Sequence, residues 1–199
     1  MEYLIQIVAS LFAALLVMIL HEIPKAMVYR LQSQKKVSLI KVLYLPQYID
    51  PIGLIFCVLS LAGFSKPYRY EIKEKKNASY IGITGLLCLL LCTVVAYFAY
   101  SVCYGGLQID QLLVDMDISQ RFNYYFICYI LLISLGMFVV NLFPISAFDM
   151  GLIIAGKSTE SFIHIIRSDT FIKIALFIVL FTEIIPILGI RMINLLLSL

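Results

Sequence analysis

The sequence contains no Trp and only two His, and its charge is sparse, since 14% of its 199 residues are Asp, Glu, Lys or Arg. Soluble domains have about 25% charged residues and about 45–50% apolar ones. This chain is 62% hydrophobic and has a mean hydropathy of +1.00. The scarcity of charge excludes a disordered tail, a coiled coil and a nucleic-acid-binding protein. Because such an excess of apolar side chains must face lipid, the composition predicts an all-α polytopic membrane protein with a single membrane domain, residues 1–199.

The cysteines do not form the close-spaced pairs of a zinc knuckle or a disulfide scaffold. They mostly lie inside apolar runs, at Cys57, Cys88, Cys92, Cys103 and Cys128. We interpret all five as small membrane-buried hydrophobic residues.

Three apolar runs are long enough to cross a hydrocarbon core of about 30 Å as helices. They predict spans over residues 1–31, 78–103 and 124–151. A fourth stretch, residues 171–199, predicts a C-terminal span, or a pair of kinked helices if Pro186 divides it.

Residues 51–67 are apolar but too few to span comfortably. Ten of the fifteen Lys and Arg residues flank its apolar run, residues 52–64, with five on each side. Because cytoplasmic loops are enriched in Lys and Arg, both flanks are expected in the cytoplasm. The segment is therefore predicted to be a re-entrant hairpin packed against other helices.

The same rule predicts an external N-terminus and an external loop at 104–121, where three Asp residues oppose Arg121 alone. The basic stretch 66–77 is expected to face the cytoplasm, and anionic membrane lipids are its predicted partners.

Two polar stretches interrupt the apolar pattern, residues 21–25 and residues 141–151. An ionisable group inside a bilayer costs about 2.5–3.5 kcal/mol on insertion scales. Alone, each stretch has the composition of an ordinary water-facing helix end or helix stop. Together they supply His, Glu and Asp, the residue set of a hydrolytic metal site. Both lie at the same predicted depth, so we expect Glu22 and Asp149 to meet inside the bundle.

These motifs resemble those of the site-2 protease family, the intramembrane zinc metalloproteases, and most closely its short bacterial members. The family has H-E-x-x-H on one helix and N-x-x-P-x-x-x-x-D-G on a later one. His21 and Glu22 match the first motif, while Asn141, Pro144 and Asp149 fall at the offsets of the second.

The resemblance implies a site-2-protease-like helical bundle in the bacterial cytoplasmic membrane. It implies that His21 and Asp149 are zinc ligands and that Glu22 is the catalytic base for a bound water. It also implies that Asn141 and Pro144 position the membrane helix of a single-span substrate or partner.

Lys25 stands where the family has its second His, so the motif here is H-E-x-x-K. An ammonium has three donors and no lone pair, so it repels zinc instead of binding it. We expect the Lys25 ammonium to replace the metal by bridging Glu22 and Asp149, and zinc to be absent. Alternatively, His164 or a water supplies the missing ligand.

Three functions remain open from the sequence. The first is a zinc metalloendopeptidase that cleaves membrane helices. The second is a non-catalytic or regulatory relative that binds a membrane helix. The third is a small transporter component whose charged residues line a polar path. Zinc content distinguishes the first function from the other two.

Overall fold

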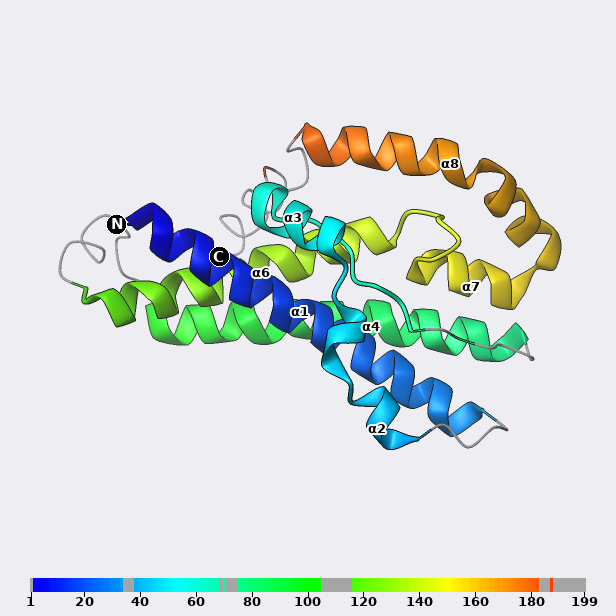
Figure 1. The fold of residues 1–199 in the computed structure, drawn as a ribbon, viewed down its shortest axis with the longest axis horizontal. Coiled ribbons are helices and arrows are strands. Elements are labelled where there is room, and N and C mark those ends of the chain that lie inside the picture. The colour runs from blue at the N-terminus through cyan, green and yellow to red at the C-terminus, as the bar shows by residue number, and fades with distance from the viewer. Residues whose placement is uncertain are drawn as a thin grey trace.

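The computed structural model describes residues 2–33, 38–68, 70, 75–104, 116–182 and 187. All regular secondary structure in these residues is helical, which confirms the predicted helical class for this part of the chain (Figure 1). The elements are α1 (Glu2–Gln32), α2 (Leu39–Val42), the 3-10 helix η1 (Leu45–Tyr48), α3 (Pro51–Ser60), α4 (Lys75–Tyr104), α6 (Ile118–Asn141), α7 (Asp149–Lys157) and α8 (Thr159–Phe181).

Three of the described helices are long and apolar enough to cross a membrane: α1, α4 and α6. The shortest, α6, has 24 residues and is therefore about 36 Å long. The three pack against one another, and α1 crosses the other two in Figure 1. Large apolar side chains such as Leu87 and Phe98 remain exposed on the outside of this bundle, as contact with lipid requires.

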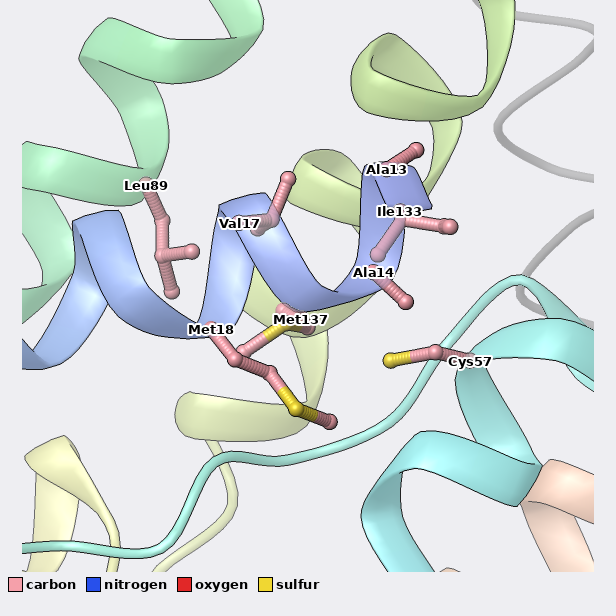
Figure 2. Packing of buried hydrophobic residues seen from close by; sticks show 8 residues of the cluster. All are labelled: Ala13, Ala14, Val17, Met18, Cys57, Leu89, Ile133 and Met137. Carbon is pink, nitrogen blue, oxygen red and sulfur yellow. The ribbon is translucent and has the colours of Figure 1, made fainter. Parts of the chain in front are cut away.

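Small side chains on α1 allow the helices to approach closely. Helices in lipid associate through close packing and not through hydrophobic burial, which favours small residues at their contacts. Figure 2 shows the resulting core, in which α1, α3, α4 and α6 all take part. Its members are Ala13, Ala14, Val17, Met18, Cys57, Leu89, Ile133 and Met137. Cys57 is fully buried, as predicted, whereas Cys103 is exposed on the protein surface.

The predicted hairpin segment forms the short helix α3. Residues 61–68 follow it and run back toward Tyr48, and we call them the returning limb. The Asp50 carboxylate caps α3 by accepting two backbone N–H groups of its first turn, at 3.0 and 2.9 Å. Leu61 ends the helix in the left-handed conformation, with a φ of 51°. The Lys66 N–H then donates to the Tyr48 carbonyl (2.9 Å), so the segment ends beside the residues from which it began.

The helix predicted at 124–151 differs from the observed one at both ends. Helix α6 begins six residues earlier, at Ile118, where Asp117 and Gln120 form a capping box. It ends ten residues earlier, at Asn141. The reason is Pro144, which disfavours helical geometry in Phe143 and cannot donate a backbone hydrogen bond.

A turn over residues 142–148 therefore separates α6 from α7, and Asp149 is the first residue of α7. Helix α7 packs on α4, and α8 packs on α7 and α3. Helix α8 begins at Thr159, twelve residues before the predicted start at 171. The remainder of the predicted 171–199 element lies largely outside the described residues, as does most of the loop predicted at 104–121.

Candidate functional site

The C-terminal third of α1 carries three of the predicted site residues. His21, Glu22 and Lys25 are each 1% exposed. Their spacing of three and four residues places them on one side of the helix. Pro24 lies between them, and α1 nevertheless continues through it to Gln32.

Asp149 meets these residues from the first turn of α7. Its side chain is fully buried, and its Oδ2 atom lies 2.7 Å from His21 Nε2. Its Oδ1 atom lies 2.7 Å from Lys25 Nζ, which is also 2.8 Å from Glu22 Oε1. The structure therefore places the Lys25 ammonium between Glu22 and Asp149, and its replacement of a metal stays a prediction. We call these four residues the buried charge cluster.

Two glycines of α4 make room for Asp149. A Cβ atom on Gly85 would lie 2.2 Å from Asp149 Oδ2, and one on Gly82 would lie 2.4 Å from the Asp149 carbonyl oxygen. Both distances are far below ordinary van der Waals contact, so the close approach of α7 to α4 requires the absence of a side chain at each position.

Two residues that follow α3 complete the surroundings of Glu22. Ser65 Oγ donates to Glu22 Oε1 (2.7 Å) and lies 2.8 Å from His21 Nδ1. The Tyr70 hydroxyl approaches Glu22 Oε2 at 3.4 Å. Neither residue belongs to a recognisable motif. The only sequence signal for them was the prediction that this segment turns back toward the helices.

The contacts show how the polar groups of the cluster pair. Ser65 has a single hydroxyl hydrogen, and it is directed at Glu22. The ring of His21 lies between Ser65 and Asp149, with Nδ1 2.8 Å from Ser65 Oγ and Nε2 2.7 Å from Asp149 Oδ2. Lys25 sets its ammonium against the two carboxylates, and such pairing offsets part of the cost of burying them.

Charge also governs the titrating groups outside the three long helices. Burial alone would raise the pKa of Asp149, but Lys25 and His21 outweigh that effect and hold the pKa below its ordinary value. Burial and the carboxylates of Glu22 and Asp149 hold the pKa of Tyr70 well above its ordinary value, so its hydroxyl remains a neutral donor.

The cluster does not have the geometry of a zinc site. Tetrahedral ligands at about 2.0–2.1 Å from zinc lie about 3.3 Å from one another. His21 Nε2 and Asp149 Oδ2 are 2.7 Å apart, in direct hydrogen bonding. Among the described residues, no group of three or more His, Cys, Asp or Glu side chains is arranged to hold a metal ion. With Lys25 beside both carboxylates, the residues as placed do not fit zinc.

The other predicted site residues are not joined to the cluster. The buried Asn141 amide donates to the Met137 carbonyl of its own helix (2.9 Å). Pro144 is half-buried in the turn after α6, and His164 is exposed on α8. Within the described residues, none of these three has a hydrogen bond or ion pair to the cluster.

Comparison of the chain with protein-family models, with curated proteins and with solved structures gives no significant match. The resemblance to site-2 proteases therefore depends on the motif offsets alone and stays a prediction.

Proposed function

We propose that this chain is a site-2-protease-like membrane protein without peptidase activity, in which the Lys25 ammonium takes the place of the catalytic zinc. The observation that supports the proposal is the position of Lys25 Nζ, within 2.8 Å of carboxylate oxygens from both Glu22 and Asp149. These are the residues that the motifs assign to the catalytic base and to a metal ligand.

An ammonium can perform one of the two tasks of a zinc ion. It neutralises buried carboxylates and so ties α1 to α7, as the metal ligands would. It cannot activate water, because it has no vacant coordination position and does not lower the pKa of a bound water to about 7 as zinc does.

Glu22 is also poorly placed to act as a general base. Its Oε1 atom accepts hydrogen bonds from Lys25 and Ser65, and its Oε2 atom faces the Tyr70 hydroxyl. A base must receive a proton from water at hydrogen-bonding distance. The three donors around Glu22 instead occupy its oxygens.

We further propose that the protein binds the membrane helix of a single-span partner without cleaving it, in a bacterial cytoplasmic membrane. In this arrangement the N-terminus is external, and the segment 51–67, which contains α3, is re-entrant from the cytoplasmic side. The distribution of Lys and Arg around residues 51–67 supports this orientation.

Zinc content tests the proposal. The full chain is purified in detergent as wild type, as Lys25→His and as the control Lys173→His, whose lysine pairs with Asp169 on the partly exposed α8. Each protein is incubated with zinc, desalted and measured by mass spectrometry, with circular dichroism as a check of folding. We expect close to one zinc per chain in Lys25→His and essentially none in the other two.

One zinc per wild-type chain, or cleavage of a labelled single-span helix by that protein, would overturn the proposal. A folded Lys25→His variant that takes up no zinc would also contradict it, because the lysine would then not stand in a latent metal site.

A further inference from the structure

A second feature of the described residues lies outside the buried charge cluster, where the residues that precede α3 face those that follow it. It is an open pocket of about 570 Å³. One wall is formed by residues 40–47, in α2 and η1, and the other by residues 66–68 of the returning limb. Pockets of about 300–1,000 Å³ accommodate small ligands. Its lining includes Ile40, Lys41, Tyr44, Gln47, Lys66 and Tyr68.

The walls of the pocket are held by the core beneath them. The Lys66 N–H donates to the Tyr48 carbonyl (2.9 Å), and the Gln47 side-chain amide donates to the Lys41 carbonyl (2.5 Å). Tyr48 itself is fully buried in a cluster with Ala26 of α1. The two walls therefore keep their spacing, which a ligand site requires.

The charges at this pocket are of one sign. Lys41 and Lys66 are both exposed, and the lining includes no acidic residue. Within the described part of the chain, neither ammonium has an ion-pair partner. Two ammonium groups on one pocket favour an anionic ligand that lies between them.

The rim of the pocket is apolar and faces outward. Ile40 is 82% exposed and Tyr44 61% exposed, whereas Val42, between them in the chain, is fully buried against the protein. Exposed apolar and aromatic side chains beside lysines are typical of a segment that lies in the membrane interface. An anion bound here would therefore be adjacent to acyl chains, which favours a lipid over a free phosphate.

We propose that this pocket binds the headgroup of an anionic phospholipid. The phosphate lies between Lys41 and Lys66, and an acyl chain extends along Ile40 and Tyr44. This site goes beyond the proposed function and does not depend on the role of Lys25, since no hydrogen bond or ion pair among the described residues joins either lysine to the buried charge cluster.

The absence of Trp from the sequence makes the site directly observable. Tyr44→Trp introduces a single Trp at the pocket rim, which is excited at a wavelength where tyrosine does not absorb, and the full chain is placed in phosphatidylcholine vesicles. A small fraction of the lipid is bromine-labelled, either as phosphatidylglycerol or as phosphatidylcholine. We expect stronger quenching by the phosphatidylglycerol label at equal mole fraction.

Matched charge variants identify the residues responsible. A juxtamembrane lysine contributes about fivefold in affinity for anionic lipid, so Lys41→Gln with Lys66→Gln should reduce the preference about thirtyfold. Lys157→Gln with Arg167→Gln removes the same charge from two exposed basic residues outside the stretch 66–77 and should leave most of the preference intact.

Three outcomes would overturn the proposal. The first is equal quenching by the two labelled lipids. The second is an equal loss in the control pair, which would indicate a general charge effect. The third is loss of the preference in millimolar inorganic phosphate at constant ionic strength, which would identify the ligand as a free phosphate.

Discussion

The most informative perturbation of the buried charge cluster is Lys25→Met, which keeps an unbranched side chain and removes the ammonium. Glu22 and Asp149 would then face each other without their shared cation, in a place where both are at most 1% exposed. Removing one partner from a buried ion pair costs about 3–5 kcal/mol, because the charge left behind is neither hydrated nor paired. We expect a loss of this size in the free energy of unfolding.

A double-mutant cycle separates this effect from simple loss of packing. In Lys25→Met with Asp149→Asn, one of the two stranded carboxylates is also neutralised. The combined loss should therefore be smaller than the sum of the single losses, with a coupling of about 1–3 kcal/mol. Ser65 still donates a hydrogen bond to the remaining carboxylate of Glu22.

The assay is unfolding of the purified protein by a graded denaturant in mild detergent, followed by circular dichroism. Lys173→Met is the control, because its 2.6 Å pair with Asp169 is of similar length but lysine 173 is 47% exposed. An exposed pair contributes about 0–1 kcal/mol. If Lys25→Met cost no more than Lys173→Met, or if the two cluster substitutions were additive, the inferred electrostatic role of Lys25 would be refuted.

Two further predictions concern the surroundings of the cluster. Gly85→Ala places a methyl group 2.2 Å from Asp149 Oδ2, so it should destabilise the protein by about 1–3 kcal/mol. Asp149→Asn should then cost little more in that background, and full additivity would contradict this contact. Asp169→Ala removes the acceptor of the Ser146 N–H (2.9 Å) and should accelerate hydrogen exchange there about tenfold, a change of about 1.4 kcal/mol. Asp169→Asn retains an acceptor oxygen and should preserve the protection; equal exchange in both variants would refute the role of this bond.

The helical class and the apolar spans were predictable because they depend on local properties. A run of apolar residues in lipid must satisfy its own backbone hydrogen bonds, and a helix does so within one segment. The first span, predicted at 1–31, therefore agrees closely with α1, Glu2–Gln32. The end of α6 was misplaced because the hydrophobic run continues past Asn141, although Pro144 disfavours helical geometry in the residue before it.

The composition of the cluster was also predictable, since ionisable residues in apolar runs are rare and need partners. The offsets of His21, Glu22 and Asp149 within the two motifs indicated which helices would meet. Ser65 and Tyr70 contact Glu22 from outside α1 and α7. These contacts were not predictable, because both are ordinary polar residues that no motif marks. Asn141 shows the opposite case: it matches a motif, yet its amide bonds to its own helix.

The amino-acid sequence by itself determined that this chain is helical and apolar enough for a membrane, and that the few charged side chains in its apolar runs would pair with one another. Those outcomes follow from transfer energies and backbone hydrogen bonding, which act residue by residue. Only the tertiary structure decided that Ser65 and Tyr70 would contact Glu22 and that Gly85 would admit Asp149 beside α4. These are contacts between residues distant in the chain, and their geometry depends on packing that no local pattern encodes.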